Sequence, residues 1–352
     1  MNHSPIVGCL LGTAVGDALG LPYERLSPRR AARLLGPPDR HRLLFGRGMV
    51  SDDTEHACLV ARALIESAGD GDRFVRRLGR HLRWWLLGLP AGLGSATLRA
   101  TLRLWCGFSP RKSGVYSAGN GPAMRSAILG AAVDDLDRLR ELVRLSTRIT
   151  HTDPKAEYGA LAVALAARAA RQPAPVDGAL YLETVRTALP ADERAAELLN
   201  LLQQAVASAA AGEALAALVQ RWNWKRGISG YVYHTVPAVI QVWLRHPRSY
   251  RDGVMEIIAA GGDADTTAAI LGGLIGTAVG RAGIPEDWLR RLLEWPRSVR
   301  WMEELGGVLE RVVVTGLPAR APRLSALGLL GRNLLFLFVV LVHAFRRLLP
   351  PY

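Results

Sequence analysis

Cysteine is scarce in this sequence, which contains only Cys9, Cys58 and Cys106 among 352 residues. Their spacing matches neither a disulfide framework nor a zinc-binding motif, which argues against a small secreted scaffold and against a thiolate metal site. All three lie in apolar stretches of the chain. We therefore expect buried, reduced thiols and a cytoplasmic location.

Lysine is also rare, because it occurs only at Lys112, Lys155 and Lys225. Arginine therefore carries nearly all of the formal positive charge behind the net value of +13. A protein that binds nucleic acid usually gathers its cations into a patch that neutralises phosphates. Here the arginines are spread along the whole chain. The charge leaves affinity for nucleic acid open, but its distribution does not indicate it.

Long uninterrupted apolar runs are lacking as well, although about 20 apolar residues are needed to cross a bilayer. Residues 1–21 are apolar, but they lack a basic start and include Asp17. A signal peptide would have a basic start and an uninterrupted apolar centre. The sequence therefore predicts that this segment is a helix of the mature protein.

The most hydrophobic run, residues 334–345, is flanked by Arg332, Asn333 and Arg346. As a helix it would be about 18 Å long, whereas the hydrocarbon core of a bilayer is about 30 Å thick. We expect a buried terminal helix rather than a transmembrane helix or an interfacial one. Its helical spacing predicts that the contacts with the domain are made by Leu334, Leu337, Phe338 and Leu341.

Strand-like alternation of apolar and polar residues is nearly absent, and apolar residues recur at helical spacing, as at Leu136, Leu139 and Leu142. Breaks at glycine and proline divide the chain into about fifteen helices, and none of them resembles a domain linker. The predicted fold class is therefore all-α. We expect one compact multi-helical domain over residues 1–305 and a C-terminal helical extension over residues 306–352.

Two segments carry a glycine at every fourth position, which places the glycines on one face of a helix. They are Gly8, Gly12, Gly16 and Gly20 in the first segment, and Gly272, Gly276 and Gly280 in the second. Glycine in a helix interior costs about 1 kcal/mol relative to alanine, so a repeated stripe indicates two backbones in close contact. Two such helices would hold neighbouring acidic groups in fixed positions.

Two short acidic turns precede apolar helices and resemble each other in composition. They are Ser51-Asp52-Asp53-Thr54, followed by Glu55, and Gly262-Asp263-Ala264-Asp265-Thr266. Helix capping explains one serine or aspartate in each turn, but it does not require several acids. If the turns face each other, each pair of like charges at 4 Å costs about 4 kcal/mol at an effective dielectric constant of about 20.

Protonation or a bound cation must relieve this repulsion. The oxygen atoms of aspartate, serine and threonine suit Mg²⁺, Mn²⁺ or Ca²⁺, whereas zinc favours histidine and cysteine. Magnesium is the first choice on these grounds. Helix capping alone remains the alternative.

Six motifs occur in a fixed order along the chain. They are residues 12–24 (GTAVGDALGLPYE), 51–55 (SDDTE), 119–130 (GNGPAMRSAILG), 150–156 (THTDPKA), 230–238 (GYVYHTVPA) and 261–267 (GGDADTT). In these motifs the chain resembles the ADP-ribosylglycohydrolase family. The resemblance implies an all-helical fold, two Mg²⁺ ions with Mn²⁺ as a substitute, and hydrolysis of an ADP-ribose glycosidic bond. The modified substrate would be a protein, a nucleic acid or a small molecule.

The resemblance also implies roles for individual acids and hydroxyls. Ser51, Asp52 and Asp53 would bind one metal ion, Asp263 and Thr266 would bind the other, and Asp265 would bridge them. Glu24 and Asp53 would form the catalytic set, with Glu24 as a general base or proton shuttle. Without the resemblance, Glu24 would be expected to be a solvated loop carboxylate. Asp17 is expected to fix the end of the first helix rather than to bind metal.

Four further segments are candidates for substrate binding. The turn Gly119-Asn120-Gly121 can offer backbone N–H groups to a diphosphate, although such a tripeptide is usually only a turn. Arg125 would add a charge to that diphosphate or lie at the surface. The resemblance places His151 beside the substrate, where the alternative is a neutral histidine without that role. Tyr231 would present its ring to adenine or ribose, or be an interior tyrosine with a bonded hydroxyl.

The sequence departs from the family pattern at Ser51 and at Ala264, where many members carry threonine, but neither change removes an expected ligand oxygen. Two other functions stay open. A phosphohydrolase acting on nucleotides would use a similar two-metal site and cleave phosphorus–oxygen bonds. A noncatalytic ADP-ribose-binding or structural protein would share the fold. The oligomeric state is not determined by the sequence.

Overall fold

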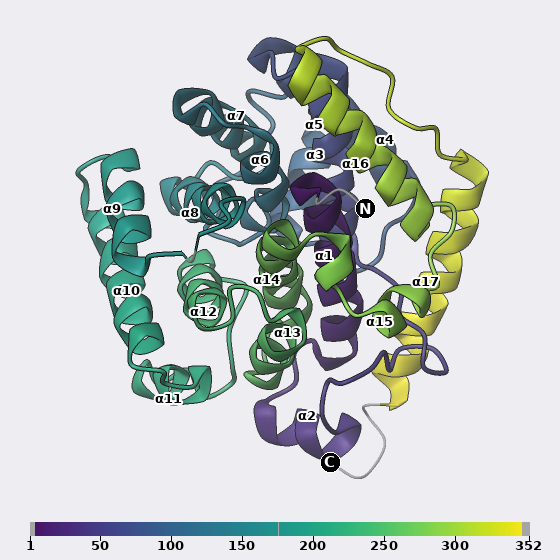
Figure 1. Ribbon diagram of the computed structural model, residues 1–352. Coiled ribbons are helices and arrows are strands. Elements are labelled where there is room, and N and C mark those ends of the chain that lie inside the picture. The colour runs from purple at the N-terminus through teal and green to yellow at the C-terminus, as the bar shows by residue number, and fades with distance from the viewer. Residues whose placement is uncertain (1–3, 175, 347–352) are drawn as a thin grey trace.

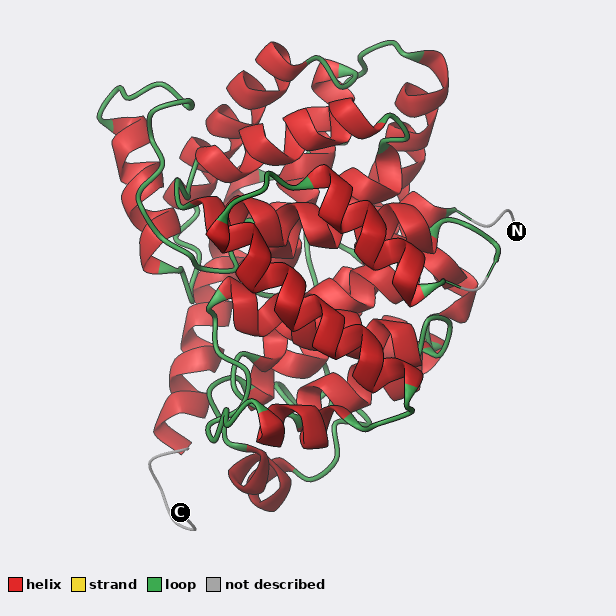
Figure 2. Cartoon of the chain, turned by 90° about the vertical axis from the view of Figure 1, so that its left-hand side faces the viewer, coloured by secondary structure: helices red, strands yellow, loops and turns green. Residues whose placement is uncertain are grey.

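The computed structural model describes residues 4–174 and 176–346. Over this range the chain is all-helical, as predicted, with isolated bridges but no strand (Figure 2). The α-helices are α1 (Pro5–Gly20), α2 (Pro28–Leu35), α3 (Asp52–Ser67), α4 (Gly71–Leu87), α5 (Ser95–Trp105), α6 (Ala127–Ala132), α7 (Leu136–Arg148), α8 (Pro154–Ala170), α9 (Gly178–Ala188), α10 (Glu193–Ala210), α11 (Leu215–Arg221), α12 (Val232–Arg245), α13 (Tyr250–Ala259), α14 (Ala264–Val279), α15 (Glu286–Arg290), α16 (Val299–Thr315) and α17 (Ala326–Arg346). Three short 3₁₀ helices are η1 (Leu21–Tyr23), η2 (Ala123–Arg125) and η3 (Arg281–Gly283).

The pair α1 and α14 forms the centre of the fold, and their glycine stripes meet as predicted (Figure 1). A Cβ atom added at Gly8 would lie 2.1 Å from the carbonyl oxygen of Gly276, and one at Gly20 would lie 2.3 Å from that of Ala264. The two helices are therefore antiparallel and in backbone contact. As a result, the C-terminal end of α1 lies beside the N-terminal end of α14, where the second acidic turn is located.

Other helices surround this pair and bury it. Helices α3, α6, α8, α12, α13 and α16 each contact α1 or α14. Helices α9, α10 and α11 lie outside α8 and α12 at one edge of the molecule, and α17 lies at the opposite edge (Figure 1). Because α1 is apolar all round, it belongs in such an interior, and nearly all of its residues are buried.

The cysteines follow the sequence prediction at two positions out of three. Cys9 and Cys58 are buried, and burial raises the pKa of each thiol to about 12. The prediction for Cys106 is wrong, because this residue is exposed. Cys106 directly follows α5 and caps its C-terminal end, so it leaves the apolar face of the helix.

The boundary expected at residue 305 falls inside α16. Leu305, Val308, Leu309 and Val312 of this helix are all buried. A Cβ atom added at Gly306 would lie 2.6 Å from a side-chain atom of α1. The compact domain therefore continues to the end of α16, and the extension consists of the segment that follows it.

The predicted length of the terminal helix is wrong. Helix α17 has 21 residues, which is about 31 Å, and it includes Arg332 and Asn333, which were expected to flank it. By length and composition alone, α17 and the segment Pro5–Tyr23 are each long and apolar enough to cross a membrane. The segment Pro5–Tyr23 is almost entirely buried in the protein, whereas most of α17 is not.

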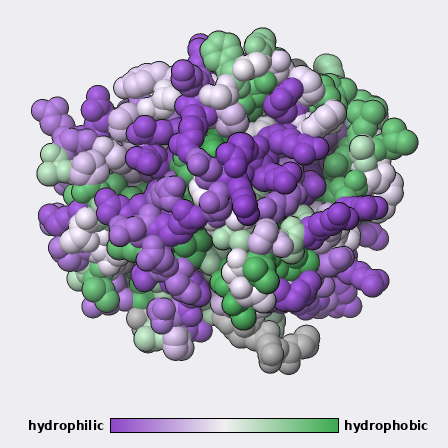
Figure 3. All heavy atoms as spheres, turned by 90° about the horizontal axis from the view of Figure 1, so that it is seen from above, coloured by the Kyte–Doolittle hydropathy of each residue, from purple (hydrophilic) through white to green (hydrophobic). Residues whose placement is uncertain are grey.

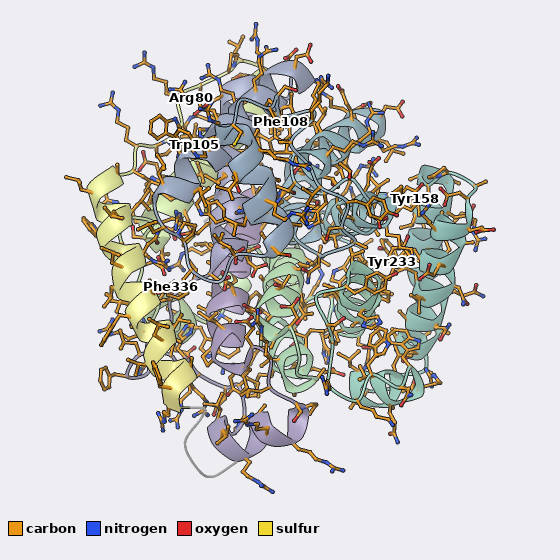
Figure 4. All side chains as sticks on the ribbon, turned by 180° about the vertical axis from the view of Figure 1, so that it is seen from behind. Arg80, Trp105, Phe108, Tyr158, Tyr233 and Phe336 are labelled. Carbon is orange, nitrogen blue, oxygen red and sulfur yellow. The ribbon has the colours of Figure 1, made fainter. Side chains whose placement is uncertain are left out.

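The predicted contact face of α17 is also wrong. Its buried residues are Gly328, Arg332, Asn333, Phe336 and Val339, and Phe336 is labelled in Figure 4. The residues expected to be buried, Leu334, Leu337, Phe338 and Leu341, are exposed. The reason is that Arg332 is neutralised inside the protein, where its Nη2 donates to Glu294 Oε1 at 2.5 Å. Asn333 likewise donates to the carbonyl oxygen of Gly88 at 2.7 Å.

Candidate active site

A buried aspartate of α1 holds the start of α3. The two carboxylate oxygens of Asp17 accept the backbone N–H of Ser51 at 3.0 and 2.9 Å. Oδ2 of Asp17 also accepts the backbone N–H of Thr54 at 3.2 Å and its hydroxyl at 2.5 Å. Burial raises the pKa of Asp17 to about 6 despite these bonds. Asp17 therefore fixes the start of α3, and not the end of its own helix as predicted.

A direct contact joins the two acidic turns, which lie adjacent as predicted. The hydroxyl of Ser51 accepts the backbone N–H of Asp53 at 3.2 Å and donates to Asp53 Oδ2 at 3.0 Å. The hydroxyl of Thr266, in the first turn of α14, donates to the same Oδ2 at 3.2 Å. One carboxylate oxygen of Asp53 is thus shared by hydroxyls from both turns.

Two glycines allow the chain to enter α14 in this position. Gly261 and Gly262 have φ angles of 69° and 86°, which favour glycine strongly. Gly262 donates its N–H to Leu26 at 2.9 Å and accepts the N–H of Arg25 at 2.6 Å. A Cβ atom at Gly262 would lie 2.0 Å from the carbonyl oxygen of Ile228. The close backbone contacts place residue 24 beside the start of α14.

The acids of the two turns raise one another's pKa. Burial is the largest cause, and it raises the pKa of Asp52, Asp53 and Asp265 well above the usual value. Neighbouring carboxylates, including Asp17, add to the shift at all three positions. Among the described residues, Oδ1 of Asp53 and Oδ1 of Asp265 are buried without a hydrogen-bond donor. The cluster therefore has the repulsion and the unsatisfied oxygens that a cation would relieve.

Glu24 lies next to this cluster and is partly exposed. Its side chain is 30% exposed to solvent, and its Oε1 lies 3.2 Å from Nε of Arg25. The negative charge of Glu24 contributes to the raised pKa of both Asp265 and Asp52. Glu24 thus combines access to solvent with proximity to the acids. Its catalytic role remains a prediction.

The turn Gly119-Asn120-Gly121 reaches the second acidic turn through a side chain. Nδ2 of Asn120 donates to Asp263 Oδ2 at 2.6 Å and to the hydroxyl of Thr235 at 2.9 Å. The backbone N–H of Asn120 donates to Gly230 at 2.9 Å. The structure therefore brings three of the sequence motifs together. Binding of a diphosphate by this turn stays a prediction.

Arg125 is completely buried, which excludes the surface position considered for it. Its guanidinium donates to the hydroxyl of Thr150 at 2.7 Å, to the carbonyl oxygen of Ser146 at 2.8 Å and to that of Gly121 at 3.3 Å. Burial lowers its pKa to about 9. Arg125 therefore supports the turn at Asn120 from inside the protein, and its described partners are all protein groups.

His151 lies against the same turn. A Cβ atom added at Gly121 would lie 3.0 Å from Cε1 of the ring, and one at Gly119 would lie 3.2 Å from Nε2. The two glycines therefore leave room for the imidazole. Burial lowers the pKa of His151 to about 3, so the ring is neutral at physiological pH. Its Nδ1 lies 2.9 Å from the hydroxyl of Thr150.

Tyr231 directly precedes α12 and is only partly buried. Its hydroxyl accepts a hydrogen bond from Lys155 Nζ at 2.9 Å and donates to Glu197 Oε1 at 3.2 Å. The sequence left open whether the hydroxyl would be bonded, and the structure shows that it is. A contact of the ring with the substrate remains a prediction.

Glu55 does not share the environment of the other acids of its turn. Its Oε1 accepts a hydrogen bond from Arg297 at 2.7 Å, and Oε2 accepts one from the indole of Trp85 at 2.5 Å. Burial alone would raise its pKa, but the charges of Arg297 and Arg332 offset this and hold the pKa below the usual value. Glu55, which the sequence places among the crowded acids, is therefore neutralised by arginines of the protein.

The chain matches the family model for ADP-ribosylglycohydrolase over residues 2–318, which is most of its length. The chain belongs to the ADP-ribosylglycohydrolase family. The relatives from Rhodospirillum rubrum and mouse named below are hydrolases, and this chain is a hydrolase of the same family. In the described part of the chain, the two acidic turns are in contact with each other. Helix α17 lies beyond the matched residues.

Three relatives illustrate the similarity. An uncharacterized protein of Archaeoglobus fulgidus is 32% identical over 304 residues, covering 84% of this chain and 93% of that protein. The ADP-ribosyl-[dinitrogen reductase] glycohydrolase of Rhodospirillum rubrum is 27% identical, covering 85% and 94%. The mouse ADP-ribosylhydrolase ARH3 is 26% identical, covering 80% and 85%. The solved structure of an ADP-ribosylglycohydrolase-related protein complex has a TM-score of 0.62 at 27% identity, covering 88% of this chain and 98% of that one.

Two structural features near the acidic turns were missed in the sequence. His56 is fully buried next to the acidic turn, where Nδ1 lies 3.1 Å from Arg125 Nη1, and burial lowers its pKa well below the usual value. The support that Arg125 gives to the turn at residues 119–121 was missed as well. Asp17 had a visible signal, because it is the only charged residue of α1. The contacts of Arg125 had none, because they depend on residues from several elements.

Proposed function

We propose that this protein hydrolyses the glycosidic bond of an ADP-ribosylated substrate with two divalent cations held between the starts of α3 and α14. Mg²⁺ is the first choice, and Mn²⁺ would substitute for it. The observation that carries the proposal is the oxygen of Asp53 that accepts hydroxyls from both turns. The names of the Rhodospirillum rubrum and mouse relatives, which are an ADP-ribosyl glycohydrolase and an ADP-ribosylhydrolase, support the choice of substrate.

The residues present fit oxygen-liganded cations. Asp53 and Asp265 each have a buried oxygen without a donor, and hydroxyls and carboxylates are ligands that Mg²⁺ accepts. Within the described residues, no three or more side chains of His, Cys, Asp and Glu form a group that could hold a metal ion. The four aspartates of the proposed ligand set do not form such a group by themselves, and the set therefore also includes two hydroxyls. It consists of Ser51, Asp52 and Asp53 for one ion, Asp263 and Thr266 for the other, and Asp265 for both.

When bound, the cations supply orientation and polarisation of the ribose hydroxyls and of water. The protein supplies the remaining chemistry. Glu24 is positioned to take a proton from the attacking water, because it is partly exposed and lies beside Asp265. Bond cleavage passes through an oxocarbenium-like state, whose positive charge the neighbouring carboxylates stabilise.

The turn at residues 119–121 is proposed to hold the diphosphate. Its backbone is fixed by Arg125 from inside and by the neutral ring of His151. The N–H of Asn120 already donates to Gly230 and that of Gly119 to the hydroxyl of Ser117, so a diphosphate would be held by the remaining N–H groups of this segment. A fixed turn of this kind orients the scissile bond toward the acids, because Asn120 also contacts Asp263.

The test is incubation of the purified protein with MgCl₂ and a panel of compounds that contain ADP-ribosyl-arginine, ADP-ribosyl-serine or O-acetyl-ADP-ribose. We expect release of free ADP-ribose from at least one of them. Asp265→Asn should abolish the release, and Asp137→Asn, at an exposed acid, serves as the matched control. Release of AMP or phosphate instead would establish a phosphohydrolase. ADP-ribose binding without any release would establish a noncatalytic protein.

A further inference from the structure

Helix α17 exposes an apolar stripe along its whole length. Leu327, Leu334, Phe338, Leu341 and Phe345 follow one another at helical spacing, and all are exposed. Phe338 is 64% exposed to solvent and Phe345 is 69% exposed. In the view from above, hydrophobic side chains gather at the right-hand edge, the side on which α17 lies in Figure 1 (Figure 3). A continuous apolar surface of this kind marks an interaction site.

Polar contacts fix the opposite face of α17 to the domain. Arg332 donates to Glu294 Oε1 at 2.5 Å and to the carbonyl oxygen of Val50 at 2.5 Å, and its Nη1 lies 3.6 Å from Glu55 Oε1. A helix that crossed a bilayer would have to carry Arg332 into hydrocarbon and leave the buried Glu294 without its paired guanidinium. The contacts therefore favour a helix that lies on a surface over one that spans a membrane.

The segment that carries the stripe has charged side chains of one sign. Residues 311–352 contain six arginines and no aspartate, glutamate or lysine; of the described ones, Arg332 is buried and paired with Glu294, whereas Arg311, Arg320, Arg323 and Arg346 are exposed. If two copies of the chain met through α17, a two-fold axis would bring these like charges together. An anionic surface would attract them instead. The charge therefore favours an anionic surface, rather than a second copy of the chain, as the partner of the exposed face of α17.

Basic and aromatic residues border the helix. A cavity of about 1100 Å³ lies between α4 and the segment that leads into α17, and it is lined by Arg73, Arg80 and Arg323 together with Trp84 and Leu327, among others. Arg80 is labelled in Figure 4. Glu66 also lines this cavity and lies 3.5 Å from Arg77, so the lining is mixed but mainly basic.

Trp295 lies at the N-terminal part of the stripe. A Cβ atom added at Gly328 would lie 2.8 Å from the ring of Trp295. Trp295 is nevertheless 64% exposed. Tryptophan and arginine beside an apolar helix face are typical of elements that lie in the interface of a membrane.

We propose that α17 is a membrane-docking helix that lies parallel to the surface of a bilayer containing anionic phospholipids. Its apolar stripe enters the acyl boundary, and the arginines contact the headgroups. The buried face keeps its contacts with the domain, so the hydrolase is held at the membrane without a transmembrane span. This proposal is independent of the substrate that the active site accepts.

The test is flotation of the full-length protein with phosphatidylcholine vesicles that contain or lack phosphatidylglycerol. We expect binding only to the anionic vesicles, with a decrease as salt is added. The double variant Phe338→Gln/Leu341→Gln should lose binding about tenfold or more, because it removes two apolar side chains from the stripe. The control is Leu102→Gln/Leu180→Gln, at leucines of similar exposure on α5 and α9, and it should bind like wild type.

Four outcomes would overturn the proposal. They are absence of wild-type binding to anionic vesicles, equal loss of binding in the control variant, retention of the protein in membranes after alkaline carbonate extraction, and a dimer in solution that Phe338→Gln/Leu341→Gln dissociates. The third would show a spanning helix, and the fourth would show a second copy as the occupant. Thermal unfolding should be the same in both variants, since all four side chains are exposed.

Discussion

Asp53 and Glu55 lie two positions apart in the first turn of α3, and both carboxyls are buried, yet their surroundings differ. Glu55 accepts hydrogen bonds from Arg297 and Trp85, and its pKa is held below the usual value because the nearby arginines outweigh burial. The carboxylate of Asp53 accepts hydrogen bonds from the hydroxyls of Ser51 and Thr266, and it keeps one oxygen without a described donor. Its pKa is raised by burial and by other acids.

The difference shows two ways in which a buried carboxylate is accommodated. Around Glu55 the protein supplies the positive charge itself, through Arg297 and Arg332. Around Asp53 and Asp265 the acids repel one another, and a cation from solution would neutralise them. The first cluster is neutralised within the protein, and the second is the proposed metal site.

The largest expected effect is on turnover. Asp265→Asn should lower metal-dependent release of ADP-ribose by about 10³-fold or more, because a metal site supplies several kcal/mol of transition-state stabilisation. Its melting temperature without metal should not fall, since the change removes repulsion. Calorimetry measures this, with Asp137→Asn as the control. A clearly lower melting temperature of the metal-free variant would show that Asp265 is structural.

Next in size is the loss of a partner in the other cluster. Arg297→Met should lower the free energy of unfolding by about 3–5 kcal/mol, because it leaves the buried charge of Glu55 without its closest cation. Chemical denaturation measures this loss. Adding Glu55→Gln to the variant should restore part of the stability. If Asp53→Asn destabilised the metal-free protein as much as Arg297→Met, the proposed difference between the two clusters would be contradicted.

A smaller effect is expected where the two helices of the core pair touch. Gly16→Ala would place a Cβ atom 2.1 Å from the carbonyl oxygen of Ala268, and overpacking costs about 1–3 kcal/mol. Because Asp17 follows directly, Mn²⁺ affinity should fall as well. Gly331→Ala is the control, since open space surrounds that helical position and alanine should be neutral or stabilising. Equal behaviour of both variants in denaturation and Mn²⁺ titration would contradict the role of the stripe.

The last effect concerns pH. Asp17 has a folded-state pKa of about 6 against 3.8 for the ordinary group, so the folded protein keeps a proton that the unfolded chain has lost between these values. Stability of the metal-free protein should therefore decrease as pH rises from about 4 to about 6, by up to about 1.4 kcal/mol per pH unit for each proton. Glu55 acts in the opposite direction, because its lowered pKa adds stability that is lost only on acidification.

Saturating Mg²⁺ should flatten this dependence, because cation binding competes with protonation of the acids. Denaturation curves across the pH window, with and without MgCl₂, measure the change. If the pH dependence of stability is identical with and without MgCl₂, these acids do not bind the cation.

Local patterns predicted the all-helical fold, the contact of the two glycine stripes and the adjacency of the two acidic turns. A glycine at every fourth position and several acids in one turn are visible within a few residues. The sequence did not distinguish Glu55 from the acids of the proposed metal site. Glu55 and Arg297 are 242 positions apart, and no residue near Glu55 in the sequence indicates this partner.

The same limit explains the errors at α17 and Arg125. An arginine in an apolar run usually ends a buried helix face, and Arg332 does not, because Glu294 from a distant loop neutralises it. Arg125 was expected at the surface or on a ligand, whereas carbonyls and hydroxyls from three segments enclose it. Burial of a charge is decided by such distant partners, which spacing along the chain does not reveal.

Titration of the metal-free protein with Mn²⁺, followed by electron paramagnetic resonance, tests the central claim most directly. The wild-type protein should bind two ions per chain, and both Asp53→Asn and Asp265→Asn should lose at least one of them. Glu55→Gln should bind as the wild type does, because its carboxylate is already paired with arginine. A wild-type protein that binds no Mn²⁺, or acid variants that bind it unchanged, would contradict the assignment of this cluster as a metal site.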